Sequence, residues 1–122
     1  MNKNIRNLLL FAAVVFGISL AASNVRAQDI TGGYGDTAVT DKDAVASAKY
    51  AVKAQAHKTH KTLKLVKIEK AQVQVVAGLN YRVCMTVREA RRKAKKVTAV
   101  VYKDLKNNLS LSRWKAGGCT DL

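Results

Sequence analysis

The sequence predicts a small α+β domain in which an antiparallel sheet of four to five strands wraps around one long helix. Residues 40–61 carry apolar side chains at helical spacing. The segments that follow are rich in β-branched residues, which is typical of strands, and several alternate apolar with polar positions. The connections between these segments are short, and short connections favour antiparallel neighbours. One thin helix and several strands can then form a single core, with the sheet curled around the helix.

Residues 1–27 are predicted to be a secretory signal peptide, which leaves residues 28–122 as the domain. A short basic start precedes the apolar stretch 8–22, which is too short and too rich in small residues for a membrane span. Val25 and Ala27 are small apolar residues where signal peptidase recognises its substrates. We expect an exported protein, located in the periplasm or secreted, since the short basic start fits a bacterium.

The charge of the chain is strongly positive. The net charge is +14, and removal of residues 1–27 leaves 95 residues with a net charge of +11. A chain of this length suits one domain. Such a surface attracts acidic proteins, lipid head groups or nucleic acids at long range, and charge alone does not select among them.

The two cysteines, Cys84 and Cys119, are predicted to form a disulfide bond. Paired cysteines in a small exported domain more often serve as a covalent link than as a nucleophile or a metal site. Their separation of 35 positions would stabilise the fold by about 4 kcal/mol in the loop-entropy description.

The chain before the strands divides into an arm and the helix. Residues 28–40 contain three glycines and no periodicity, so we expect an extended, mobile arm. Thr40 or Asp41 can cap the helix that follows. Its apolar stripe is predicted to comprise Val45, Ala48, Val52 and Gln55, with Ala44 and Ala51 beside it.

Four strands are predicted after the helix. Residues 62–77 change phase within one β run, which indicates a bulge or a strong bend. Residues 80–89 alternate cleanly and direct Tyr81, Val83, Met85 and Val87 to one side. Residues 97–103 and the run LSLSRWK supply the last two strands, and DLKNN forms the turn between them.

We expect neither enzymatic activity nor a cofactor. The sequence has no nucleotide-binding loop, no dinucleotide fingerprint and no recognisable serine–histidine–acid motif. His57 and His60 could both face a metal ion, but two ligands make a weak site and a solvated helix end explains them better.

The segment REARRKAKK, residues 88–96, holds six positive residues and one negative. It could bind phosphate groups or anionic lipid. Its charge could equally keep the sheet edge from pairing with another molecule. It contains no aromatic residue to stack on a base, which disfavours single-stranded nucleic acid. The candidate contacts to an anionic surface are Arg91, Arg92, Lys93, Lys95 and Lys96.

The apolar hairpin tip QVVAG, residues 74–78, resembles the Q-x-V-x-G signature of the cystatins, which inhibit papain-like cysteine peptidases. The similarity extends over nearly all of the domain. GGYGD resembles the glycine segment of the family, AVASAKYAVKAQ its helix, and AVVYKDLKNNLSLSRWK its final hairpin. The resemblance implies a cystatin-like fold, with one long helix wrapped by an antiparallel sheet.

The resemblance also implies a wedge that enters the cleft of a peptidase without offering a cleavable bond. Its three parts are the glycine arm, the QVVAG hairpin and the second hairpin. Gln74 can fix the hairpin by hydrogen bonding, because its amide both donates and accepts. The residues expected to contact the peptidase are Gly32, Gly33, Gln74, Val75, Val76, Ala77, Gly78 and Leu105.

Two features depart from the family pattern. The second hairpin usually carries Pro-Trp, whereas here Asp104 and Leu105 occupy the tip. Cys84 lies one strand earlier than the first cysteine of the C-terminal pair in animal cystatins. We expect a monomeric, reversible, non-covalent inhibitor of papain-like peptidases, with no stable membrane insertion once the signal is removed. The alternative is a basic cystatin-fold module that binds anionic lipid, polysaccharide or nucleic acid without inhibiting peptidases.

Overall fold

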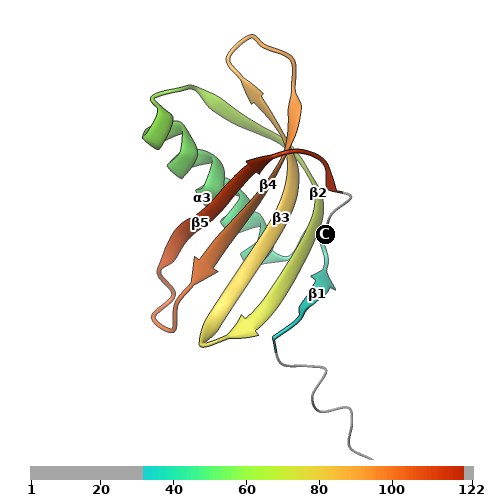
Figure 1. Cartoon of the computed structure of the whole chain (residues 1–122), viewed down its shortest axis with the longest axis vertical. Coiled ribbons are helices and arrows are strands. Elements are labelled where there is room, and N and C mark those ends of the chain that lie inside the picture. The colour runs from blue at the N-terminus through green and yellow to red at the C-terminus, as the bar shows by residue number, and fades with distance from the viewer. Residues whose placement is uncertain (1–31, 120–122) are drawn as a thin grey trace, which may run out of the picture. The chain divides into compact units, whose positions relative to one another are not determined.

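The computed structural model describes residues 32–119, so the predicted signal peptide of residues 1–27 lies outside the described residues. One helix and five strands are present in this part of the chain. They are β1 (Tyr34–Thr37), α3 (Lys42–Thr59), β2 (Leu63–Val76), β3 (Gly78–Glu89), β4 (Lys95–Lys103) and β5 (Leu109–Ala116). The strands form one antiparallel sheet in the order β1-β2-β3-β4-β5, and α3 packs on one face of it (Figure 1). The predicted fold class is confirmed.

The helix α3 begins and ends at well-defined caps. The carboxylate of Asp41 accepts hydrogen bonds from the backbone N–H groups of Asp43 (3.1 Å) and Ala44 (3.0 Å), so Asp41 is the N-cap. At the other end His60 adopts the left-handed conformation (φ 55°) that commonly terminates helices. Of the two capping residues that the sequence offered, Asp41 therefore takes this role.

The buried stripe of α3 contains the three alanines that were predicted, but it differs from the prediction at three other positions. Val45 and Gln55 are only partly buried, so their assignment to the centre of the stripe was wrong. Ser47, which the prediction omitted, is 1% exposed. Small side chains on this face let the helix backbone approach the sheet closely. The buried residues of α3 are Ala44, Ser47, Ala48, Ala51 and Val52.

The inner face of β3 and β4 forms the other half of the core. The predicted alternation of β3 is confirmed, because Tyr81, Val83, Met85 and Val87 are all buried. Val97, Ala99 and Val101 of β4 continue the same layer. This layer covers the small residues of α3, as two-layer packing requires.

The strand β2 is irregular, as its phase change predicted. Its register against β3 shifts between Leu65 and Lys67 and again between Ile68 and Lys70. These shifts are β-bulges, which bend a strand and increase its twist. The bend lets the long β2–β3 ribbon curve along α3.

Part of the predicted arm is a strand. Residues 34–37 form β1, which pairs antiparallel with residues 71–74 of β2, so this part is extended as expected but is held to the sheet, which corrects the expectation of a mobile segment there. Residues 28–31 of the arm lie outside the described residues. The backbone groups of Tyr34–Thr37 are paired with the edge of β2, which explains how a segment without apolar periodicity forms a strand. Among residues 32–119, no helix is long and apolar enough to cross a bilayer.

Candidate functional site

Three separate segments meet at one end of the sheet. They are the start of β1, the β2–β3 hairpin and the β4–β5 hairpin, which all lie at the lower end in Figure 1. The side chain of Gln74 joins the first two: its Nε2 donates to the backbone oxygen of Gly32 at 2.6 Å. Asn80 in turn donates from Nδ2 to Oε1 of Gln74 at 2.9 Å. Gln74 thus uses both halves of its amide, as its chemistry suggested.

The tip of the β2–β3 hairpin requires glycine at position 78. Gly78 has φ +110°, a conformation that residues with a side chain rarely adopt. A Cβ atom there would lie 2.5 Å from the backbone oxygen of Lys103 and 2.9 Å from the hydroxyl of Tyr102. The Tyr102 hydroxyl donates to the backbone oxygen of Ala77. The tip is therefore pressed against β4 and tied to it.

The β4–β5 hairpin is a compact turn built on Asp104. The carboxylate of Asp104 accepts hydrogen bonds from the backbone N–H groups of Lys106 and Asn108, each at 2.8 Å. These bonds, that from Asn108 first, lower the pKa of the Asp104 carboxyl from its ordinary value. Asn107 takes the left-handed conformation (φ 71°). The turn holds Leu105 at its apex with 80% of its surface exposed.

The two hairpin tips border a common hollow of about 350 Å³. Val75 and Val76 are 55% and 42% exposed, so the apolar side chains at this end remain in solvent. Exposed apolar groups gathered at a few neighbouring positions often mark a binding surface. The lining residues are Val75, Val76, Gly78, Leu79, Lys103, Asp104, Leu105 and Asn107.

The structure also locates the remaining predicted site residues. Gly33 and Ala77 are exposed near the same end. The predicted disulfide bond between Cys84 and Cys119 is present, with the two Cα atoms 5.5 Å apart. Among residues 32–119, no three His, Cys, Asp or Glu side chains gather in a way that could hold a metal ion.

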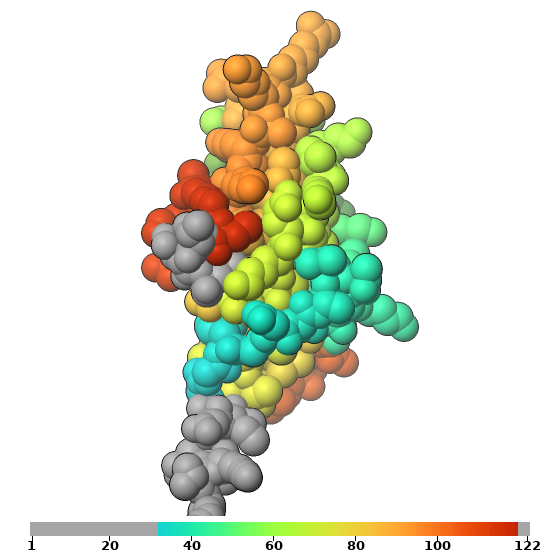
Figure 2. All heavy atoms as spheres, turned by 90° about the vertical axis from the view of Figure 1, so that its right-hand side faces the viewer, coloured from blue at the N-terminus to red at the C-terminus, as the bar shows by residue number. Residues whose placement is uncertain are grey.

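The basic segment occupies the opposite end of the sheet. Residues 90–94 connect β3 to β4, and this loop, orange at the top of Figures 1 and 2, lies far from the QVVAG tip. Figure 2 also shows the cyan start of β1 beside the yellow hairpin at the other end. The exposed basic residues at the loop are Arg91, Arg92, Lys93, Lys95 and Lys96.

Sequence reasoning missed two residues that organise the candidate site, Asn80 and Tyr102. Asn80 lies in register with both Gln74 and Tyr102, so the three form one row across the sheet. The partner of Gln74 could have been found by assuming a tight hairpin at Ala77, which places position 80 opposite 74. No local signal relates Tyr102 to Ala77, because the contact depends on the register in which β4 pairs with β3.

Residues 37–116 match the family model SQAPI, described as aspartic acid proteinase inhibitor. This match covers more than half of the chain. The comparison with curated proteins gave no significant match.

Solved structures of cystatins share the fold. A salivary cystatin of the soft tick Ornithodoros moubata is 19% identical, with a TM-score of 0.62; the match covers 72% of this chain and 99% of that one. Mialostatin, a gut cystatin of the hard tick Ixodes ricinus, is 18% identical, with a TM-score of 0.61; the match covers 72% of this chain and 100% of that one. Dimeric human cystatin F is 13% identical, with a TM-score of 0.61; the match covers 82% of this chain and 98% of that one. The cystatin-like architecture inferred from the sequence is confirmed by these similarities.

Proposed function

The chain belongs to the aspartic acid proteinase inhibitor family, and from this premise we propose that it is a reversible, non-covalent peptidase inhibitor that binds through the two hairpin tips and the adjoining arm. The observation that carries the proposal is the hollow between the tips, with Val75, Val76 and Leu105 exposed around it. These side chains would bury against the walls of a peptidase cleft.

The energetics favour engagement of all three segments together. About 100 Å² of apolar surface buried at the QVVAG tip would contribute about 2.5 kcal/mol. Association costs roughly 4–15 kcal/mol in lost translational and rotational freedom. The tip alone is therefore insufficient, and contacts from Leu105 and from the arm at Gly32 and Gly33 must supply the remainder. Because Gln74 already ties the arm to the hairpin, less freedom is lost on binding.

We propose papain-like cysteine peptidases as the first target class. The Q-x-V-x-G tip supports this assignment, since a glycine at position 78 permits close approach of another backbone to the tip. The absence of Pro-Trp at the second hairpin weakens one contact, because tryptophan is a stronger interface anchor than Leu105.

Aspartic peptidases are the second candidate class, and the description of the matching family favours them. A narrow apolar wedge can enter any extended peptide-binding cleft, so the same edge serves both proposals. The two classes differ in the catalytic groups that the wedge would cover.

Matched variants test the proposed edge against both classes. Val75→Asn and Leu105→Asn place a polar group at the edge, whereas Val66→Asn makes the same change at a 48% exposed valine of the β2 bulge, away from the tip. Asparagine is uncharged at every assay pH, so one set of proteins serves for papain and for pepsin. We expect at least a tenfold rise in the inhibition constant for Val75→Asn, a smaller rise for Leu105→Asn and no change for Val66→Asn.

Papain must be activated and freed of excess thiol before mixing, because reductant would cleave the Cys84–Cys119 bond. Inhibition of pepsin alone would assign the second target class. Full activity of both enzymes at micromolar inhibitor would reject the proposed function and leave the basic binding module as the alternative.

We also propose that the protein is exported and monomeric. The Cys84–Cys119 disulfide bond supports export, since such bonds persist in oxidising compartments. Removal of residues 1–27 during secretion, detected by mass spectrometry of the mature protein, tests this part of the proposal.

A further inference from the structure

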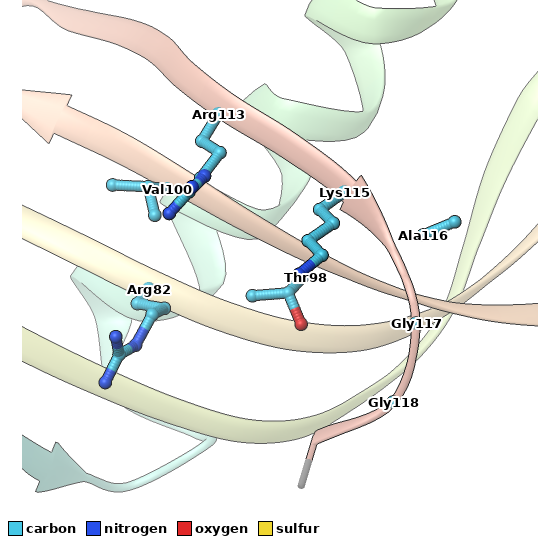
Figure 3. Close-up of a pocket in the computed structure, with 8 residues that line it drawn as sticks. All are labelled: Arg82, Thr98, Val100, Arg113, Lys115, Ala116, Gly117 and Gly118. Atoms are coloured by element: carbon cyan, nitrogen blue, oxygen red, sulfur yellow. The ribbon is translucent and has the colours of Figure 1, made fainter. Parts of the chain in front are cut away.

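A second hollow lies on the outer face of the sheet, the face that α3 does not cover. Its volume is about 120 Å³, well below the roughly 300–1,000 Å³ of pockets that enclose drug-sized ligands. It is therefore suited to one small chemical group. The residues that line it, shown in Figure 3, are Arg82, Thr98, Val100, Arg113, Lys115, Ala116, Gly117 and Gly118.

Arg82, Arg113 and Lys115 line this hollow, and no acidic residue among residues 32–119 belongs to its lining. Within residues 32–119, neither Arg82 nor Arg113 nor Lys115 has a carboxylate oxygen within 4 Å, although three lysines elsewhere do form ion pairs. Gathering like charges is unfavourable, and a bound anion relieves it. The hollow thus has the electrostatic character of an anion site.

The cations stand on strands β3 and β5, and Arg113 lies beside a register shift between Val100 and Val101. Arg82 and Arg113 both lie in register with Val100, on the two sides of β4, and Lys115 lies in register with Thr98. The side chains of Arg113 and Lys115 leave β5 and reach over β4 (Figure 3). Groups fixed on strands hold their positions better than groups on loops, which favours a built site.

Arg82 is oriented by neighbours before any ligand arrives. Its Nε and Nη2 donate to Oε1 of Gln72 at 2.9 and 2.6 Å, and its guanidinium lies 3.9 Å from the centre of the Tyr34 ring. Gln72 is itself held by Asp36, to which its Nε2 donates at 3.0 Å. An arginine has five N–H donors, so three remain for an anion.

The C-terminal tail forms one wall. Gly117 donates its backbone N–H to the oxygen of Lys96 at 3.0 Å and has φ +142°. From there the chain turns to Cys119, which is bonded to Cys84 on the outer face of β3. A side chain at Gly117 would be strained. The glycines and the disulfide bond together set the edge of the hollow.

We propose that this hollow binds a single sulfate or phosphate group, and that its natural carrier is a sulfated polysaccharide. The hollow is sized for one oxyanion, and bidentate contacts from arginine suit such groups. Exposed Lys96 lies beyond it toward the end of the sheet, which favours a carrier with more than one negative charge. Among residues 32–119, the lining offers no aromatic ring for base stacking, which disfavours single-stranded nucleic acid.

Two double variants with the same change in charge test the site. Arg113→Gln/Lys115→Gln alters the hollow, and Arg91→Gln/Lys93→Gln alters the exposed loop. Binding of a heparin-derived oligosaccharide is measured by calorimetry at 150 mM salt, and inorganic sulfate is titrated while backbone amide shifts are followed by NMR. We expect at least a tenfold loss of oligosaccharide affinity for the hollow variant, at most threefold for the loop variant, and sulfate shifts concentrated at Thr98, Gly117 and Gly118.

Equal weakening by the two variants would overturn the proposal, because it would indicate diffuse attraction to a basic surface. Sulfate shifts spread over the whole sheet would overturn it as well. Single-stranded DNA bound as tightly as the oligosaccharide, with the same sensitivity to the hollow variant, would overturn the polysaccharide assignment. The assays involve no peptidase, so their outcome is independent of the proposed inhibition. Amide spectra that change only near the substituted positions show that both variants are folded.

Discussion

Gly78 was singled out from the sequence as a peptidase contact, but it also has a role in the fold of the free protein. Its positive φ and the 2.5 Å approach to Lys103 leave no space for a side chain even in the free protein. We predict that Gly78→Ala lowers the free energy of unfolding by about 1–3 kcal/mol, the range for strained backbone positions. Urea unfolding measures the loss.

Gly35→Ala is the matched control for this prediction. Gly35 lies in β1, its added Cβ would meet nothing within 4 Å, and its φ is not positive. The control should change stability by at most about 0.5 kcal/mol. Equal effects of the two variants would show that the close approach at Gly78 does not constrain the tip. The comparison also explains why a large substitution at Gly78 is a poor test of peptidase binding, since it disturbs the hairpin itself.

Ser47 presents the opposite case, a polar residue whose removal should help. Its hydroxyl is buried and is the one side-chain polar atom among residues 32–119 that is buried without a hydrogen-bond partner. We predict that Ser47→Ala raises the free energy of unfolding by about 1 kcal/mol, because it removes an unsatisfied group and favours the helix. Ala46→Ser, at an exposed position of the same helix, measures the difference in helix propensity between alanine and serine alone. A loss of stability in Ser47→Ala would contradict the expected cost of this hydroxyl.

At the residue scale, the sequence predicts those parts of the site that depend on nearby positions. The QVVAG tip, the role of Gln74 and the exposure of Leu105 follow from local chemistry and from a familiar motif. The Tyr102–Ala77 contact joins positions 25 apart, and the cation cluster on the outer face joins residues of β3 and β5 across β4. Such features depend on strand register, which the sequence determines only once the whole sheet is assembled.

At the scale of elements, the N-terminus of α3 is fixed to the sheet through Asp43. The Tyr81 hydroxyl donates to the Asp43 carboxylate at 3.4 Å, and Lys103 forms an ion pair with it at 3.1 Å. Burial, then the negative charges of Asp43 and Asp41, raise the pKa of Tyr81 from 10.0 to about 12. The hydroxyl of Tyr81 thus connects β3 to the first turn of the helix in its protonated form.

This connection predicts a loss of stability in alkali. Between pH 10 and 12 the unfolded chain releases the Tyr81 proton while the folded chain keeps it, so stability falls as pH rises through this window. The contribution is fully present below pH 10 and amounts to at most about 3 kcal/mol. Urea unfolding of the native chain and of Tyr81→Phe at pH 9 to 11.5 isolates the contribution of the Tyr81 hydroxyl. Lysine titration affects both proteins alike and therefore cancels in the comparison. Parallel stability curves for the two proteins would rule out the raised pKa.

The elements themselves were largely predictable, and the exceptions have physical causes. The helix, the bulged strand and the last three strands each carry a periodic pattern or turn residues that specify them. β1 carries neither, because its four residues gain their hydrogen bonds from β2 and their packing from Arg82 and Gln72. The centre of the helix stripe was misplaced because alanine and serine can face either water or a core, and the sheet decides which.

At the scale of the whole molecule, the exposed apolar tips and the basic loop are separated, although Lys103 also borders the hollow at the tips. The hairpin tips with Val75 and Leu105 occupy one end of the sheet, and the basic loop occupies the other. The oxyanion hollow lies on the outer face, on strands that connect these ends. A peptidase seated on the tips would therefore leave the basic surfaces accessible. The proposed inhibition and the proposed binding of an anionic carrier are therefore compatible in one small domain.

The disulfide bond stabilises this arrangement in a way that can be tested for the whole molecule. It closes a loop of 35 positions and should contribute about 4 kcal/mol by restricting the unfolded chain, a large part of the roughly 5–15 kcal/mol typical of a domain. We predict that Cys84→Ala/Cys119→Ala lowers the free energy of unfolding by up to this amount. The sheet should persist, because β3 is paired with β2 and β4 along its length. Urea unfolding followed by far-UV circular dichroism measures both the loss of stability and the persistence of the sheet. The native chain with its disulfide bond reduced should be as stable as the double variant. Equal stability of the oxidised chain and the double variant would contradict the prediction.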